Sequence, residues 1–257
     1  MTLLLLAPRI NETSLQLLTC ARRRGLRAHT AVRWEVPAEL AGLRPAHLYG
    51  GPLFADAAAG ALGVAPLEPP ADWPASLPAD LLGRQVECTT LAEARRLRRP
   101  AFLKPPVDKL FPARVYPDGS GLPGPDALDD DTLVQVSDVV AFASEYRLFV
   151  LDGAVRAASR YAVDGGLAVS PGVGPEVLAF AADVLAAGGL PSAVVVDVGR
   201  LTDGTWAVVE ANPAWASGSY ACDPDHVLDV VLRAAGPAEA VTPADRPYTR
   251  PVPEVVR

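Results

Sequence analysis

The first quarter of the chain alternates short apolar runs with amphipathic segments, a pattern that predicts an α/β lobe. The apolar run LLLLA at residues 3–7 is typical of a buried strand. Asn11 or Thr13 can cap the helix that follows, which is expected to end near Arg24. Alternation of this kind predicts a partly parallel sheet. Further elements follow: a strand at 26–32, a strand at 47–51 and a helix at 54–62.

The second half of the chain predicts two β-hairpins, because Asp-Gly dipeptides interrupt runs of alternating apolar and polar residues. In the first hairpin, at residues 144–161, the turn lies at Asp152-Gly153 and places Glu145 opposite Arg160. The side chains of successive strand residues alternate between the two faces. One face is therefore expected to hold the charged residues Glu145, Arg147, Arg156 and Arg160, and the other to be core, with Tyr146, Leu148 and Tyr161.

The second hairpin, at residues 193–213, has its turn at Asp203-Gly204. This register places Asp197 directly opposite Glu210, with Asn212 on the same face one step along. Both hairpin predictions assume a two-residue turn, and a β-bulge in either hairpin would shift its register by one residue.

Two carboxylates that face each other on a sheet repel, by about 4 kcal/mol at roughly 4–5 Å and an effective dielectric near 20. A stable sheet does not favour that pairing. Two interpretations therefore stay open: the face is open to water, or a cation lies between the acids. Side-chain oxygens of Asp, Glu and Asn are hard ligands suited to Mg²⁺, which also leaves positions for water and phosphate oxygens.

Composition narrows the class of protein. The 257 residues carry a net charge of −7, and half of them are hydrophobic, which is enough for a folded core. The acidic balance argues against a general nucleic-acid binder. No apolar stretch is long enough for a membrane span, and the N-terminus lacks a signal-peptide core, so a cytoplasmic protein is expected. The three cysteines are scattered and predict neither a disulfide framework nor a metal site.

The segment VVVDVGRLTDGTWAVVEANPAWASG, at residues 194–218, resembles the metal-binding end of the ATP-grasp superfamily. In that family a strand with an Asp and an Asp-Gly turn precede an E-x-N strand and a loop of small residues. Glu210-Ala211-Asn212-Pro213 fits the E-x-N-P core. The resemblance implies that Asp197, Glu210 and Asn212 hold one or two Mg²⁺ ions that bridge the phosphates of ATP.

The resemblance extends upstream over most of residues 80–225 and implies a nucleotide-binding role for several residues there. The chain has only two lysines, Lys104 and Lys109, both in the segment FLKPPVDKLF that resembles the nucleotide clamp. An ammonium group there suits phosphate. The remaining implied contacts are phosphate for Arg84, Arg147 and Arg160, adenine through the main chain of Gln135, Val136 and Ser137, and ribose for Glu145.

Other interpretations of three of these features stay open. Arg84 could be an ordinary surface arginine, and Glu145 could form a structural ion pair with Arg160 across the hairpin. In the loop at residues 214–223, Ser217, Gly218 and Tyr220 are candidates to contact an acceptor substrate. The alternative is that Trp215 and Tyr220 serve packing alone.

The resemblance implies an α+β, ATP-grasp fold, with an α/β lobe at 1–76, a small clamp at 77–134, a larger antiparallel-sheet lobe at 135–236 and a Pro-rich tail at 237–257. The implied activity is ATP- and Mg²⁺-dependent ligation of a small-molecule or peptide carboxylate to an amine or another nucleophile, through an acyl phosphate, with release of ADP and phosphate. Lys104, Arg147 and Arg160 are the predicted catalytic residues. The alternatives are a phosphotransferase, a nucleic-acid end-modifying ligase or a non-catalytic nucleotide-binding module, and the tail could support a homodimer.

Overall fold

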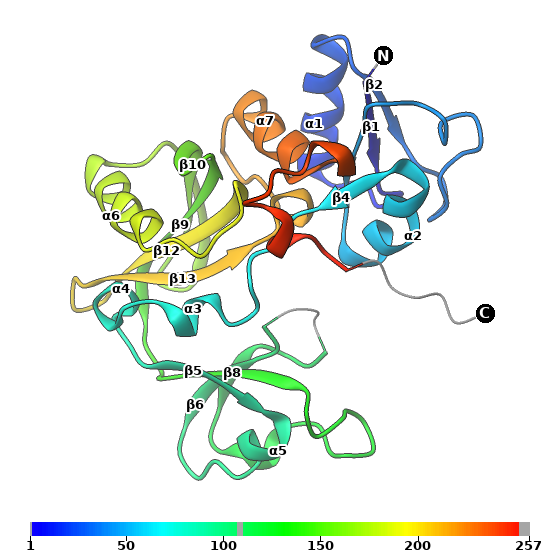
Figure 1. Ribbon diagram of the computed structural model, residues 1–257. Helices are drawn as coiled ribbons and strands as arrows, with labels where there is room; N and C mark the ends of the chain where they lie inside the picture. Colours follow the sequence, from blue (N-terminus) through cyan, green and yellow to red (C-terminus); the bar gives the residue numbers. More distant parts are fainter. Residues whose placement is uncertain (1, 107–109, 252–257) are drawn as a thin grey trace.

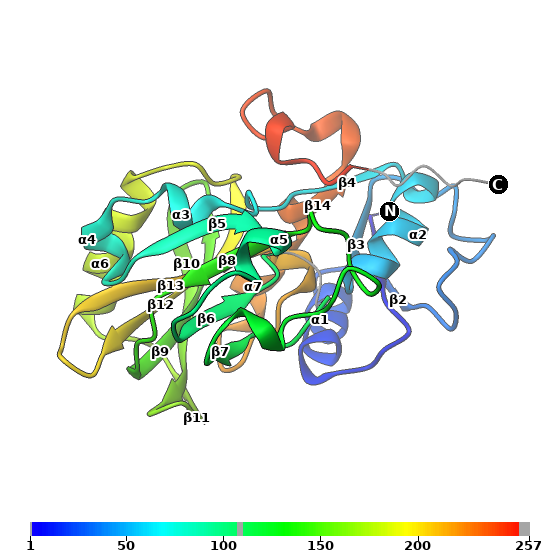
Figure 2. The ribbon, with the colours of Figure 1, turned by 90° about the horizontal axis from the view of Figure 1, so that it is seen from below.

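The protein is described by a computed structural model that places residues 2–106 and 110–251. Helices combine with antiparallel and parallel sheets, which confirms the predicted α+β class. Figure 1 shows a large sheet next to an N-terminal lobe, with a small sheet below them, and Figure 2 shows the same arrangement from below. None of the helices in the placed ranges is both long and apolar enough to cross a lipid bilayer.

The N-terminal lobe contains β1 (Leu3–Leu6), α1 (Glu12–Arg23), β2 (Arg27–Thr30), β3 (Ala46–Tyr49), α2 (Pro52–Leu62) and β4 (Val64–Pro66). Its strands form a parallel sheet in the order β2-β1-β3, as predicted, and every leucine of β1 is buried. Asn11 caps α1, because its side chain accepts a hydrogen bond from the Ser14 N–H while the Ser14 hydroxyl accepts one from the Asn11 N–H. α2 begins at Pro52 and ends at Gly63, which adopts the left-handed conformation.

The small sheet contains β5 (Val86–Thr90), β6 (Ala101–Lys104), β7 (Arg114–Tyr116) and β8 (Leu133–Ser137), in the order β5-β8-β6-β7. The short helix α5 (Leu91–Ala94) covers one face of it and shares a core with Leu103, Val134 and Val136. The predicted lobe boundaries stay predictions, but β8 pairs entirely within this sheet, so the sheet extends beyond residue 134.

The large sheet contains β9 (Phe142–Leu151), β10 (Ala154–Val163), β11 (Gly166–Pro171), β12 (Ala193–Leu201) and β13 (Trp206–Asn212), in the order β11-β10-β9-β12-β13. On one face, α6 (Pro175–Ala186) packs against apolar side chains such as Val150 and Val196. On the other face, α7 (Pro224–Ala234) packs against Phe149 and Val195 and joins the sheet to the core of the N-terminal lobe.

Short elements connect these three parts: α3 (Trp73–Ser76), α4 (Ala79–Leu82), β14 (Ala235–Pro237) and the 3-10 turns at Gly119–Gly121, Ala214–Ala216, Ala238–Ala240 and Arg246–Tyr248. The strand β14 pairs with β4, and the segment after it returns along the N-terminal lobe, where the Arg250 N–H donates to the Pro66 carbonyl over 2.7 Å. In this segment the buried Asp245 accepts hydrogen bonds from the N–H and hydroxyl of Ser192, next to β12. The end of the described chain is thereby fixed to both lobes.

The two predicted hairpins differ in how well their registers were predicted. In the β12–β13 hairpin, Asp197 lies opposite Glu210 and Val195 opposite Asn212, as predicted. In the β9–β10 hairpin the predicted register is wrong beyond Val155, because the pairing shifts there and again after Arg160. β-bulges cause such shifts by adding one unpaired residue to a strand.

The Gly119 turn generates a prediction about the stability of the small lobe. A Cβ atom at Gly119 would lie 2.2 Å from the carbonyl oxygen of Ala94, so main-chain atoms would have to move. Gly119→Ala is expected to lower the free energy of unfolding by about 3 kcal/mol, measured by guanidinium denaturation. Gly124→Ala, where the Cβ meets open space, is the matched control. Equal unfolding midpoints for the two variants would contradict this packing.

Candidate active site

Three charged side chains form a row across the central strands of the large sheet. Arg147 on β9 lies opposite Asp197 on β12, which lies opposite Glu210 on β13. Asp197 is 1% exposed and accepts two hydrogen bonds from the Arg147 guanidinium, at 2.9 Å to Nε and 2.6 Å to Nη2. This bidentate geometry is the strongest form of an Arg–carboxylate contact.

Lys104 reaches this row from the small sheet. Its Nζ lies 2.5 Å from Glu210 Oε2, and the Asn212 amide donates to Glu210 Oε1 over 2.8 Å. Each of the two opposed acids thus has its own cation, one from β9 and one from the small sheet. The structure adds a third solution to the two that the sequence left open, because cations of the protein itself separate the two negative charges.

Burial and these pairs determine the charge states of the row. Burial raises the pKa of Asp197, and the Arg147 guanidinium opposes that shift. Burial also acts to raise the pKa of Glu210, but Lys104 and Asn212 outweigh it and hold that pKa below its usual range. The pKa of Arg147 is raised, since its interaction with Asp197 outweighs the effect of burial. Arg147 and Glu210 are therefore charged near neutral pH.

Glu145 and Tyr161 lie beside the row, and the sequence prediction misplaced the tyrosine. The Tyr161 hydroxyl donates to Glu145 Oε2 over 2.7 Å, and its ring centre lies 5.8 Å from the Arg147 guanidinium carbon. Because of the register shift after Arg160, Tyr161 lies on the charged face and not in the core. Burial raises the pKa values of both Glu145 and Tyr161. No periodicity in the sequence indicates this shift, so Tyr161 was missed.

Arg160 does not join these residues, which corrects its predicted position. It lies opposite Tyr146, not Glu145, and its Nε donates to the Ala168 carbonyl on β11 over 3.2 Å. Residues directly opposite on a sheet share a face. Arg160 therefore shares the face of Tyr146, while Arg147 lies on the other. The alternative Glu145–Arg160 ion pair does not form either, since Tyr161 is the hydrogen-bond partner of Glu145.

Arg84 serves the junction between the two sheets. Its guanidinium donates to the carbonyls of Val208 and Val209 on β13, at 2.7 and 3.3 Å, and to the Ser137 hydroxyl at 3.1 Å. A further bond reaches the carbonyl of Leu82. Arg84 is therefore neither the surface arginine nor a free phosphate ligand in this conformation, because protein acceptors hold its donors.

The predicted adenine-binding residues form the inner strand of the small sheet. Gln135, Val136 and Ser137 belong to β8, which pairs with β5 on one side and β6 on the other. A strand with two neighbours directs its main-chain N–H and C=O groups to those neighbours. The main-chain contacts that the resemblance implied at these residues therefore compete with the sheet. Lys109, the second predicted phosphate ligand, lies outside the described residues.

The loop after β13 is fixed from two sides. The Tyr49 hydroxyl of β3 donates to the Ser217 carbonyl over 3.0 Å, and Arg147 Nη1 donates to the Gly218 carbonyl over 3.1 Å. Tyr220 has a left-handed φ of 47° and stacks on Tyr161 with ring centres 5.0 Å apart. Arg147 thus contacts both the acid Asp197 and the loop predicted to face an acceptor.

Two of the loop's other predicted residues are packed inside the protein. Trp215 is fully buried, and its indole N–H donates to the Leu67 carbonyl over 2.8 Å, as the packing interpretation expected. Ser217 is also buried, whereas Gly218 is exposed. Next to them Ser219 bonds to Thr13 and Gln16 of α1, which ties the loop to the N-terminal lobe. Sequence reasoning missed Thr13 and Tyr49, because their partners lie more than 150 residues away.

The chemistry of the side chains tests whether a metal fits here. Asp197, Glu210 and Asn212 supply carboxylate and amide oxygens, the ligands that Mg²⁺ prefers. Each carboxylate oxygen keeps a second lone pair while it accepts a hydrogen bond from Arg147 or Lys104. The donor set fits Mg²⁺, although no group of three or more His, Cys, Asp or Glu residues in the described ranges forms a metal cluster.

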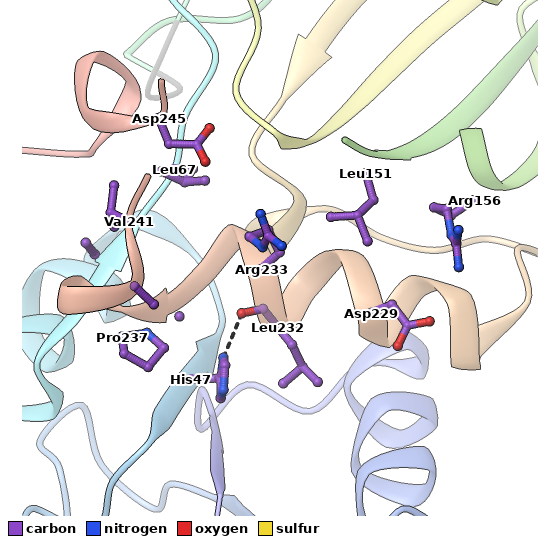
Figure 3. Close-up of a pocket in the computed structure, with 13 residues that line it drawn as sticks. His47, Leu67, Leu151, Arg156, Asp229, Leu232, Arg233, Pro237, Val241 and Asp245 are labelled. Carbon is purple, nitrogen blue, oxygen red and sulfur yellow. Dashed lines mark hydrogen bonds between the residues drawn. The ribbon is translucent and has the colours of Figure 1, made fainter. Parts of the chain in front are cut away.

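A cavity of about 420 Å³ lies away from this row, between α7, the β9–β10 hairpin and the C-terminal segment. Figure 3 shows Arg233 and Leu232 on α7 at its centre, with Leu151, Val241 and Asp245 around them. None of the predicted site residues lines it. The candidate active site is therefore the interface between the small and large sheets and not this cavity.

Comparison with known proteins identifies what the chain is similar to. The profile of a family described as an ATP-grasp domain, the second family of its clade, matches residues 81–230. A search of curated proteins found no significant match. Among solved structures, a RimK domain protein of the ATP-grasp type from Sphaerobacter thermophilus is 17% identical with a TM-score of 0.57, over 90% of this chain and 100% of that one.

Two further structures show the same fold. The D-cycloserine synthetase DcsG is 14% identical with a TM-score of 0.56, over 91% of this chain and 99% of that chain. The D-alanine–D-alanine ligase from Bacillus anthracis is 12% identical with a TM-score of 0.53, over 91% and 97% of the two chains. At these identities the similarity concerns the fold alone.

The bonds of Arg84 predict a structural effect. Arg84→Met removes four hydrogen bonds and leaves buried carbonyls without donors, so it is expected to lower the free energy of unfolding by about 3 kcal/mol in urea denaturation. Arg99→Met is the control, since Arg99 is half-exposed and makes only a 3.5 Å contact with Asp138. Unchanged stability in Arg84→Met together with weaker nucleotide binding would instead identify Arg84 as a phosphate ligand.

Proposed function

Because the chain belongs to the ATP-grasp family, we propose that it is an ATP-dependent ligase that joins a carboxylate to an amine or another nucleophile. The observation that carries this proposal is the row Arg147–Asp197–Glu210 on the large sheet, completed by Lys104 from the small sheet. Two cations and two acids meet there at the interface of two sheets. That arrangement suits a reaction in which negative charge moves between oxygen atoms.

The nucleotide would lie between the two sheets. Lys104 is proposed to hold its phosphates as a compact positive charge, and Glu145 to accept hydrogen bonds from the ribose hydroxyls. Since β8 directs its main-chain groups to its neighbours, we assign the main-chain contacts with the base to residues 139–140, directly after that strand. Asp197, Glu210 and Asn212 would hold Mg²⁺, which neutralises charge on the phosphate oxygens when bound.

In the first proposed step, an oxygen of the substrate carboxylate attacks the γ-phosphorus of ATP. The bond from that phosphorus to the bridging oxygen breaks, ADP leaves, and an acyl phosphate remains. Arg147 and Lys104 are placed to stabilise the negative charge that develops on the transferred group. Arg160 has no part in this step, because it lies on the other face of the sheet.

In the second step the lone pair of the nucleophile attacks the acyl carbon. The carbon–oxygen bond to phosphate breaks, phosphate leaves with that electron pair, and the nucleophile loses a proton. The loop at residues 217–220 lies beside Arg147 and is fixed by Tyr49 and Thr13, so the acceptor would be positioned between this loop and the N-terminal lobe. Holding both reactants in line is the main contribution expected of the protein.

The proposal predicts the effect of removing one acid. Glu210→Gln is nearly isosteric, but it takes away the partner of Lys104 and one negative metal ligand. ADP release from Mg²⁺-ATP, measured with a panel of amino acids and short peptides, is expected to fall about 100-fold or more. Glu239→Gln, at an exposed position after β14, is the control and should keep the wild-type rate.

The products of the same assay separate the alternatives. A ligase of the proposed type releases ADP and phosphate, and the rate depends on both the carboxylate and the nucleophile. Release of AMP would favour a nucleic-acid end-modifying ligase. If wild type and Glu210→Gln released ADP at the same rate, the acid would have no catalytic role and the proposal would be wrong.

A further inference from the structure

Gln135 lies on the face of the small sheet that is turned away from that sheet's own core. Its cross-strand partners are Cys88 on β5 and Lys104 on β6. Directly opposite residues share a face, so these three side chains form a row on one side of the sheet. The residues before and after Gln135, Val134 and Val136, point to the other side and belong to the core with α5.

The large sheet lies across from this row. Lys104, beside Gln135, reaches Glu210 on β13. The side chain of Gln135 is therefore directed into the same interface, where we propose that the nucleotide binds. Only 3% of Gln135 is exposed.

The amide of Gln135 has no hydrogen-bond partner among residues 2–106 and 110–251, although its neighbour Lys104 has one. Burying an amide without partners costs free energy, about 1–3 kcal/mol in protein mutational data. No side-chain nitrogen or oxygen atom in the described ranges is both fully sealed and unpaired, so the amide group keeps some access from the interface. A buried polar group in this situation is suited to pair with a ligand.

The chemistry of the amide narrows the ligand. Its oxygen accepts one hydrogen bond and its NH₂ group donates another, side by side. Adenine presents the complementary pair, the N6 amino donor and the N7 acceptor, whereas guanine presents two acceptors, O6 and N7. A glutamine amide therefore pairs with adenine at both atoms but with guanine at only one.

We propose that the Gln135 side chain recognises the N6 and N7 atoms of the adenine base and so selects ATP over GTP. This inference rests on the proposed function in one respect, that a purine nucleoside triphosphate binds between the two sheets. Its neighbour Lys104, one strand away, would then hold the phosphates of the same nucleotide. The role differs from the main-chain contact expected at this position, because it depends on the side chain.

The test combines a change in the protein with a change in the base. Wild type and Gln135→Met are titrated with Mg²⁺-ATP and with Mg²⁺-7-deaza-ATP, in which N7 is replaced by carbon. Methionine keeps the length of the side chain but has no amide. Wild type is expected to bind 7-deaza-ATP about three- to tenfold more weakly than ATP, and Gln135→Met to bind both equally. The ATP-to-GTP affinity ratio should fall about tenfold in the variant.

Controls separate this inference from folding and from the proposed function. Cys88→Ser changes a neighbour in the same row and should keep the wild-type preference for ATP over 7-deaza-ATP. The thermal unfolding of each variant is measured alongside, and the ratio of two affinities within one protein does not depend on the fraction folded. Equal affinities of wild type for ATP and 7-deaza-ATP, or the same preference in Gln135→Met, would overturn the inference alone. Failure of wild type to bind any nucleotide would overturn the proposed function as well.

Discussion

Two carboxylates that lie opposite each other on neighbouring strands constrain the rest of this site. Asp197 and Glu210 would repel by about 4 kcal/mol at roughly 4 Å if left alone at an effective dielectric near 20. The fold compensates with Arg147 from the adjacent strand and Lys104 from a different sheet. Because one cation comes from the small sheet, the charge balance of the site depends on how the two sheets approach each other.

The same contacts connect the acids to both proposed substrates. Lys104 lies in a row with Gln135 on the face proposed to hold the nucleotide, and Arg147 bonds both Asp197 and the Gly218 carbonyl of the loop proposed to face the acceptor. Arg84 fixes the small sheet to β13 near the acids. Nucleotide, metal and acceptor would thus meet where three parts of the fold are bonded to one another, which suits a reaction that depends on alignment.

Local sequence signals predicted part of this site. The Asp203-Gly204 turn and the alternation around it gave the correct opposition of Asp197 and Glu210. In the first hairpin the same reasoning failed, because two register shifts moved Tyr161 onto the charged face and Arg160 off it. Bulges depend on packing with β11 and β12, which no local pattern encodes. The structural role of Arg84 was equally hidden, since its acceptors are main-chain carbonyls about 125 residues away.

The most direct test of this account is calorimetric titration of the wild-type protein with ATP, once with Mg²⁺ present and once with Mg²⁺ removed by a chelator. If Asp197, Glu210 and Asn212 hold a metal shared with the phosphates, ATP should bind at least about tenfold more tightly with Mg²⁺ than without it. Equal affinities in the two titrations, or no binding in either, would contradict the claim that these opposed acids form a metal–nucleotide site.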